Sequence, residues 1–267
     1  MTSPNAILIE QPAGLTRTSL KRLARIAGVF YLIVGITGGF SEGYFDPKLY
    51  VPGDAAATAG NVVANAGLVP LAVIAHLTDA VFFVLTATTL YLLLKHVHKH
   101  VARLMVIAVT IAAGIISVCA VFTFVALQVA TDPSYVATFG AAGSQALVLL
   151  LLEIQHYGIL AAQVFFGLWL APLGYLAYRS GLFPKALGVI LVVATVSYLL
   201  DVVLAFLLPD LAKQIHIFLG IAPAISEIWM VFYLLVVGVR SPRATARPPV
   251  AEVAPDPGGL TPSRTSR

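Results

Sequence analysis

The strongest constraint on this chain is a series of six apolar stretches, each long enough to cross the ~30 Å hydrocarbon core of a bilayer as a helix. Apolar residues make up 59% of the 267 residues and charged residues only 10%, which is far from the composition of a soluble domain. We therefore expect an all-α, polytopic membrane bundle with the lipid bilayer as its surroundings. The predicted spans are residues 26–45, 70–94, 104–130, 144–178, 184–208 and 215–239.

Basic residues predict the orientation of this bundle. Fourteen of the sixteen Lys and Arg residues lie in the N-terminal segment, in 95–103, in 179–185 and from residue 240 onward, while only Lys48 and Lys213 lie in the other connections. Because cytoplasmic connections carry an excess of Lys and Arg, we expect both termini in the cytoplasm. The basic residues flank the spans, so the sequence pI of 9.2 does not indicate nucleic-acid binding. Nothing in the sequence indicates an oligomeric state.

The chain divides into three predicted parts. Residues 16–240 form the six-helix transmembrane domain. Residues 1–15 and the cytoplasmic tail 241–267 are predicted to be disordered, because the tail holds six of the sixteen prolines and almost no large apolar side chain.

The connections on the outer side are predicted to be 46–68, 131–143 and 209–214. Asp46 precedes a proline and is expected to end the first span, since the residue before proline is disfavoured in a helix. Asp54 is a predicted N-cap for a short amphipathic helix over 55–66, with Gly67 as its stop. This short helix is expected at the outer membrane surface.

Ionisable residues within the spans form the candidate site. A rise of 1.5 Å per residue from the inner helix ends places most of them in one outer layer, at depths of roughly 22 to 33 Å, with Glu227 deeper at ~16 Å beside Pro223. Each embedded charge costs ~2.5 to 3.5 kcal/mol on insertion scales, so these groups need a partner, water, a metal or a proton. No Lys or Arg lies at their depth. The candidate residues are Glu42, His76, Asp79, Glu153, His156, Tyr198, Asp201 and Glu227.

Two short motifs in this layer place ligand-type side chains on one helix face. Glu153 and His156 are three residues apart, as are His76 and Asp79, and residues at this spacing share a helix face. Such pairs supply metal ligands in helical bundles. A divalent metal is therefore a candidate cofactor, with His76, Asp79, His156 and Asp201 as its ligands. No other cofactor is indicated, because the sequence has no phosphate-binding glycine loop or nucleotide fingerprint.

Three functions remain open for the layer. It is a structural hydrogen-bond network, a protonation-dependent site that binds or transports a small molecule, lipid or ion, or the centre of an intramembrane metal-dependent hydrolase that acts on lipid. The excess of acids argues against a purely structural network. The lack of a polar path through the inner half argues against transport.

Several sequence blocks resemble a known family. They include Val51-Pro-Gly-Asp-Ala-Ala-Ala-Thr58, His156-Tyr-Gly158, the stretch from Gly174 to Gly181 and Ser197-Tyr-Leu-Leu-Asp201. These blocks resemble the bacterial membrane family named domain of unknown function 4386, over about residues 20–240. The resemblance implies a multi-pass protein of the bacterial inner membrane without an assigned activity, and it supplies no catalytic residue.

Overall fold

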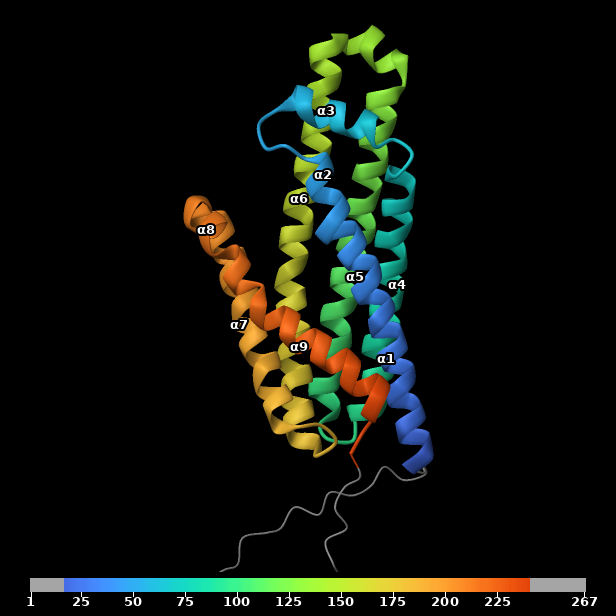
Figure 1. The fold of residues 1–267 in the computed structure, drawn as a ribbon, viewed down its shortest axis with the longest axis vertical. Helices are drawn as coiled ribbons and strands as arrows, with labels where there is room; N and C mark the ends of the chain where they lie inside the picture. Colours follow the sequence, from blue (N-terminus) through green and yellow to red (C-terminus); the bar gives the residue numbers. More distant parts are fainter. Residues whose placement is uncertain (1–16, 241–267) are drawn as a thin grey trace, which may run out of the picture.

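The computed structural model describes residues 17–240, and these residues contain helices but no strands. Six helical stretches in this part of the chain are long and apolar enough to cross a membrane, which confirms the all-helical, six-span part of the predicted fold class. They form an elongated bundle in which residues 17 and 240 lie at the same end (Figure 1). We call this the terminal end and the opposite one the α3 end. The predicted disordered segments, 1–15 and 241–267, lie outside the described residues.

The first span is longer than predicted. Helix α1 (Arg17–Phe40) continues through one stretch of π-helix, η1 (Ser41–Phe45), into α2 (Asp46–Leu49). The expectation that Asp46 ends the span was wrong, because Asp46 keeps helical angles (φ −56°, ψ −42°) and Pro47 falls in the first turn of α2, where no N–H is required. Asp46 therefore lies on the same continuous helical stretch, α1–η1–α2, as Glu42.

The short helix α3 (Ala55–Ala64) lies across the bundle at the α3 end (Figure 1). The backbone N–H of Ala57 donates to Asp54 Oδ1 at 2.9 Å, so the predicted N-cap is confirmed. The helix ends before Asn65, slightly earlier than predicted. That this end of the bundle faces the outside stays a prediction.

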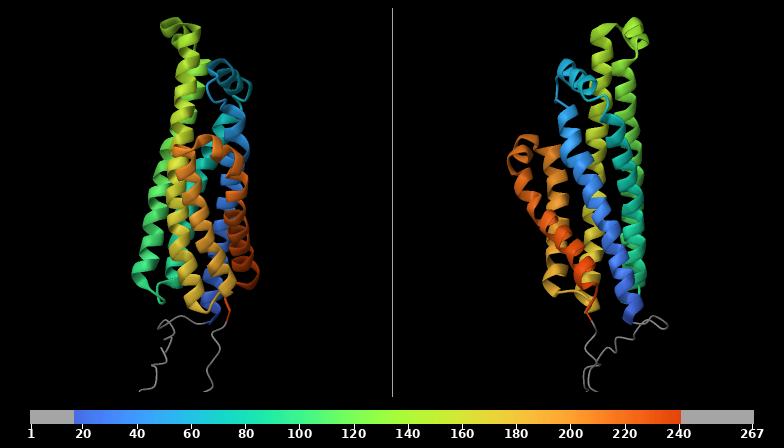
Figure 2. Two further views of the ribbon diagram at one scale, coloured as in Figure 1. Left: turned by 90° about the vertical axis from the view of Figure 1, so that its left-hand side faces the viewer. Right: turned by 45° about the vertical axis from the view of Figure 1, so that its right-hand side comes forward.

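Helices α4 (Val69–Leu94), α5 (Lys99–Thr131) and α6 (Pro133–Ser180) follow. Asp132 alone separates α5 from α6, and it accepts a hydrogen bond from the Ser134 N–H at 2.9 Å, so the chain re-enters a helix where a longer connection was predicted. A bend at Gly140 (φ 72°, ψ 167°) then interrupts α6. The α5–α6 pair extends beyond the other spans at the α3 end (Figure 2).

The last two spans form a hairpin that leans away from α1 and α2 toward the α3 end (Figures 1 and 2). It consists of α7 (Lys185–Leu207), α8 (Pro209–Leu219), α9 (Ile221–Phe232) and the π-helix η2 (Tyr233–Val237). The predicted connection 209–214 is helical instead, because Leu208 is the single residue between the end of α7 and the start of α8. Gly220 separates α8 from α9, three residues before Pro223, whose missing N–H weakens the helix there.

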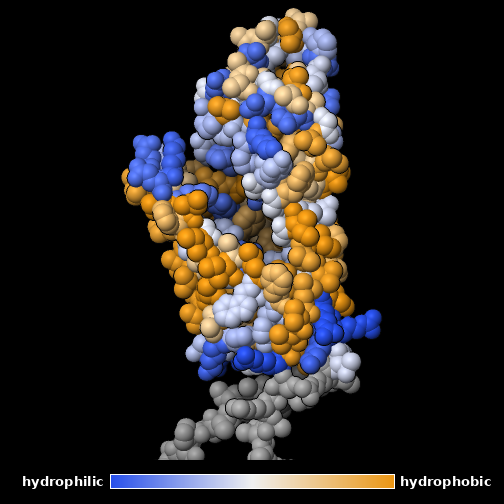
Figure 3. Space-filling model, in the orientation of Figure 1, coloured by the Kyte–Doolittle hydropathy of each residue, from blue (hydrophilic) through white to orange (hydrophobic). Residues whose placement is uncertain are grey.

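Two apolar clusters hold the bundle at its opposite ends. The larger lies at the terminal end and includes Leu93, Met105, Leu173 and Leu187. The smaller lies beneath α3 and includes Val62. The spans also expose many large apolar side chains, as expected for a surface in contact with lipid (Figure 3).

Glycines let α6 and α7 approach closely in the terminal half. A Cβ atom on Gly174 would lie 2.7 Å from the Gly188 carbonyl oxygen, and a Cβ atom on Gly188 would lie 2.8 Å from that of Gly174. Small residues at such crossings allow backbone contact between membrane helices. The close packing here means that the lean of the α7–α9 hairpin develops toward the α3 end.

Candidate functional site

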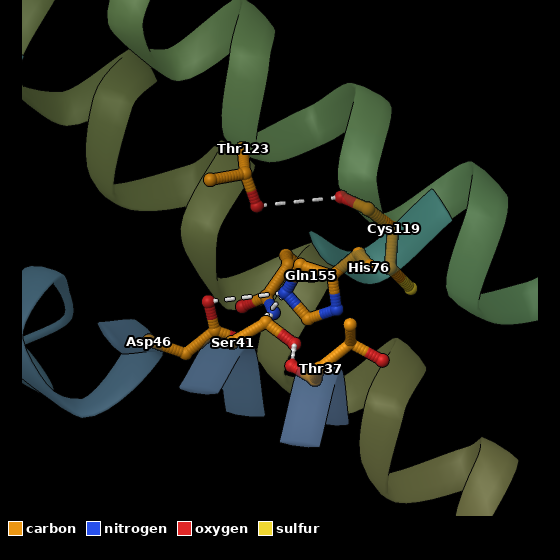
Figure 4. A network of polar contacts seen from close by, with 7 residues as sticks. All are labelled: Thr37, Ser41, Asp46, His76, Cys119, Thr123 and Gln155. Carbon is orange, nitrogen blue, oxygen red and sulfur yellow. Dashed lines mark hydrogen bonds and ion pairs between the residues drawn. The ribbon is translucent and has the colours of Figure 1, made fainter. Parts of the chain in front are cut away.

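A buried network of polar side chains joins three helices of the bundle (Figure 4). Gln155 on α6 donates its side-chain N–H to Asp46 Oδ2 at 2.7 Å, and His76 Nε2 on α4 lies 3.1 Å from the same oxygen. The His76 side chain is fully buried, while that of Asp46 is 16% exposed. Asp46 is thus the shared partner of one amide and one imidazole.

Further acids lie next to this group. The Thr37 hydroxyl donates to the Ile33 carbonyl oxygen at 2.8 Å and lies 3.4 Å from Asp79 Oδ1. A Cβ atom on Gly38 would lie 3.2 Å from the same Asp79 oxygen, so a glycine at this point of α1 gives the carboxylate room. Glu42 interacts electrostatically with Asp79, and also with His76, Asp46 and Glu227. We define the polar core as Thr37, Glu42, Asp46, His76, Asp79 and Gln155.

Two buried atoms of the polar core have no hydrogen-bond partner among the described residues. They are Glu42 Oε1 and His76 Nδ1. Figure 4 shows the His76 ring between Asp46 and Thr37, with its unpartnered nitrogen turned away from Asp46. Unpartnered buried polar atoms are uncommon in folded proteins and require an explanation.

Glu227 on α9 is held by two phenols. The hydroxyl of Tyr31 donates to Glu227 Oε2 at 2.8 Å, and that of Tyr198 donates to Oε1 at 3.1 Å. These bonds tie α1 and α7 to α9 at one carboxylate.

The two tyrosines also belong to a chain of aromatic contacts. Ring centroids lie 5.4 Å apart for Tyr31 and Trp169, 5.1 Å for Trp169 and Phe83, 5.9 Å for Phe83 and Phe166, and 6.1 Å for Phe166 and Tyr198. Because Tyr31 and Tyr198 both donate to Glu227, the first and last rings of this chain share one carboxylate as their partner. We call these five rings the aromatic floor, because they belong to or pack against the apolar cluster of the terminal end.

Glu153 and His156 border the polar core. The side chain that α6 buries here is Gln155, which is 4% exposed, whereas His156 is exposed and Glu153 is partly exposed. The inward face of α6 includes residues 148, 152 and 155, and at 100° per residue Glu153 and His156 both fall on the same side of this face, beyond its edge. His156 lies 5.1 Å from the Tyr50 ring, centroid to centroid. The pKa of Tyr50 is raised by burial and then by the charge and hydrogen bond of Glu153.

Asp201 takes a partner that was not predicted. Its carboxylate oxygens lie 2.9 and 3.0 Å from His216 Nδ1, so the pair links α7 to α8. The Asp201 side chain is 8% exposed and that of His216 is 65% exposed. Asp79 and Asp201, although similar in depth, therefore make different contacts.

The predicted metal ligands do not converge. His76 pairs with Asp46, Asp79 lies beside Thr37, His156 lies against the Tyr50 ring and Asp201 pairs with His216. Within residues 17–240, no three His, Cys, Asp or Glu side chains are grouped so as to hold a metal ion. The donor set does not fit the predicted divalent metal, and we derive no hydrolytic step through one.

Five residues that bond to the acids or to the imidazole of the site were absent from the predicted layer: Thr37, Asp46, Gln155, Tyr31 and His216. Asp46 was assigned to a connection, although its position four residues after Glu42 is the spacing of one helix face. Gln155 lies between the two residues that formed the predicted motif. Tyr31 and His216 carried no separate sequence signal, because their role depends on which helices become neighbours.

Comparison with known proteins identifies a family. The family described as Domain of unknown function (DUF4386) matches residues 26–238. An uncharacterized protein of Archaeoglobus fulgidus is 29% identical over 85 residues, which are 32% of this chain and 49% of the relative, so the match spans about half the length of that protein. No solved structure matches the chain significantly.

Proposed function

This chain belongs to the DUF4386 family, and from its own geometry we propose that it binds a positively charged ligand in the polar core in exchange for protons held by the core carboxylates. Glu42, Asp46 and Asp79 lie in this core, with Glu227 in electrostatic range of Glu42. The ion pairs of the described residues bring no Lys or Arg to any of the four, and His76 is the one imidazole bonded to them. Acids buried in excess of bases attract cations and protons.

The unpartnered Glu42 Oε1 atom carries the proposal. A network that served stability alone would supply a donor to this oxygen, because a buried acceptor without one costs about 1–3 kcal/mol. His76 Nδ1 is left open in the same core. Both atoms are explained if the core takes up a ligand from outside the protein.

The molecular surface offers access to this region. Figure 3 shows a hollow between helices α7 and α8 on one side and the continuous α1–η1–α2 stretch on the other, with polar residues inside it. Glu42 lies on the α1–η1–α2 stretch and Glu227 lies on α9. Helix α9 crosses the bundle at the terminal side of the hollow (Figure 1). On the terminal side of the hollow, the described residues form the apolar cluster of the terminal end. These features support a binding site with one entrance, and transport would require the α7–α9 hairpin to move.

The proposal places the protein in the bacterial inner membrane with both termini in the cytoplasm. The support is the distribution of Lys and Arg, of which fourteen in sixteen fall on the segments that this orientation puts inside. The hollow then opens toward the outer side of the bilayer.

The test uses purified protein in detergent and a panel of monovalent inorganic and quaternary ammonium cations. At a ligand concentration of 100 times Kd, binding should raise the free energy of unfolding by about 2.7 kcal/mol, and it should release protons into weakly buffered solution. Glu42→Gln should reduce both effects. Asp210→Asn is the matched control, because the Asp210 side chain is 94% exposed and pairs with the exposed Lys213.

The proposal fails if no cation in the panel stabilises the wild-type protein. It also fails if Glu42→Gln releases as many protons on cation addition as the wild-type protein does.

A further inference from the structure

We infer that the ligand is an organic ammonium ion with an apolar body, bound with its charged group between Glu42 and Glu227 and its apolar part in the hollow beside α7–α9. This inference rests on the proposed function and specifies its ligand class. Three observations carry it: the dispersed carboxylates, the aromatic floor and the apolar walls of the hollow.

The carboxylates are arranged for a large cation. Small inorganic cations such as Mg²⁺ and Ca²⁺ need six or more oxygen ligands at about 2.0–2.6 Å. In the described residues the acidic side chains do not converge in this way. Glu42 and Glu227 belong to different helices and interact electrostatically without bonding to each other. Two separated acids suit a ligand whose positive charge is spread over several atoms.

The surroundings of Glu227 suit an organic cation. Its two hydrogen-bond donors are tyrosines, and both rings continue into the aromatic floor. Aromatic faces attract ammonium groups by about 2 kcal/mol or more where water is excluded, and they favour alkylated ammonium over strongly hydrated ions. Trp169, the best ring type for this interaction, is 1% exposed and contacts the Tyr31 ring edge to face.

The walls of the hollow suit an apolar ligand body. Figure 3 shows apolar surface on both sides of the hollow. Tyr157 of α6 and Phe206 of α7, which are both exposed, have ring centroids 6.1 Å apart, so aromatic surface joins these two helices. An apolar group that leaves the bilayer would therefore stay in contact with apolar or aromatic side chains. The Asp201–His216 pair joins α7 to α8 on this side.

The experiment follows the fluorescence of Trp169. Trp229→Phe leaves Trp169 as the sole tryptophan, since the sequence has two. This protein is titrated with benzyltrimethylammonium chloride, with sodium and potassium chloride, and with uncharged benzyl alcohol. The quaternary ammonium has no proton to lose, so any pH dependence of its binding belongs to the protein.

Benzyltrimethylammonium should give a saturable change in fluorescence with an affinity at least tenfold higher than that for sodium or potassium. Its affinity should rise with pH, because the cation competes with protons for the carboxylates. Glu227→Gln should lower the affinity at least tenfold, whereas Asp210→Asn should leave it unchanged within twofold.

Variants at Tyr198 separate the role of the ring from that of the fold. Tyr198→Phe keeps the ring and its contact with Phe166, so affinity should fall by less than fivefold. Tyr198→Leu removes the ring and should cost more affinity than Tyr198→Phe. Equal affinities in the two variants would overturn the aromatic part of the inference, and a variant that elutes as aggregate is replaced by Tyr31→Phe and Tyr31→Leu.

The remaining outcomes are also decisive. Equal or tighter binding of sodium or potassium would overturn the inference and leave the proposed cation site standing. Equal binding of benzyl alcohol would show an apolar pocket without charge selection, which also overturns it. If no cation binds, both the inference and the proposed function are refuted.

Discussion

Replacing Asp46 with alanine tests the arrangement on which the site depends. The change removes the acceptor of Gln155, at 2.7 Å, and the partner of His76, at 3.1 Å. His76 is fully buried and Nδ1 already has no partner, so both ring nitrogens would then be unpaired. Each buried polar group left without a partner costs about 1–3 kcal/mol.

The net loss should be smaller than the sum of these costs. Removal of Asp46 also removes one carboxylate that repels Glu42. The Asp46 side chain is 16% exposed, so water can replace part of the lost bonding to Gln155. We expect Asp46→Ala to lower the free energy of unfolding by about 2–4 kcal/mol, given the desolvation cost of the two orphaned groups. Asp46→Asn keeps one acceptor oxygen and should cost less than half as much.

Reversible unfolding in mixed micelles measures these differences. A double-mutant cycle with Gln155→Leu isolates the contact, and a coupling energy of about 0.5–3 kcal/mol is expected for residues that share a bond. Asp210→Ala is the exposed control and should behave as the wild-type protein. If Asp46→Ala is as stable as wild type and shows no coupling to Gln155, Asp46 does not enter the core. The first span would then end at Asp46, and the proposed site would lose its centre.

Three other predictions concern the whole bundle. With the basic segments in the cytoplasm, cysteine at Ser134 should be labelled from outside intact cells and cysteine at His98 should not. Gly174→Ala should lower stability by about 1–3 kcal/mol, because its Cβ atom would lie 2.7 Å from the Gly188 carbonyl oxygen. Burial lowers the pKa of His96, so the unfolded chain binds a proton more readily than the folded chain. The free energy of unfolding should therefore be unaffected by His96 above the unfolded pKa of about 6.5 and should decrease as pH falls from that value toward the folded pKa. Thermal unfolding between pH 7.5 and 5 would detect this decrease.

Each of these three predictions has a control and an opposing result. Labelling of His98 in intact cells would reverse the orientation. Gly35→Ala has open space around its new Cβ atom, so a loss equal to that of Gly174→Ala would refute the close approach of α6 and α7. His96→Gln should flatten the pH dependence in this range, and an unchanged slope would assign it to other groups.

The sequence alone determined the architecture of this protein and the types of groups that it buries. Apolar length sets the number of spans, because a helix is the structure that satisfies every backbone group in lipid without partners. The same logic placed α4, α7 and the Asp54 cap of α3 within a few residues of their observed positions. It also identified Glu42, Asp79 and Glu227 as acids that need an explanation.

Local signals failed where tertiary contacts decided the outcome. A residue before proline usually leaves a helix, yet Asp46 stays helical, where it bonds to side chains of α4 and α6. Leu208 alone replaced the connection predicted for 209–214, since Pro209 begins α8 directly. These differences lengthened the first span and the last hairpin at the α3 end.

Tertiary structure alone decided which polar residues meet. Depth along a helix follows from counting residues, so the sequence placed Asp79 and Asp201 at one level. Their partners depend on how each helix is rotated about its axis and on which helices are neighbours. In the structure, Asp201 contacts His216 and Asp79 contacts Thr37. A rotation of 100° per residue also explains why α6 buries Gln155 while Glu153 and His156 remain at the border. The position of a residue along its helix sets the depth of its side chain in the membrane, whereas the packing between helices sets the direction in which that side chain points.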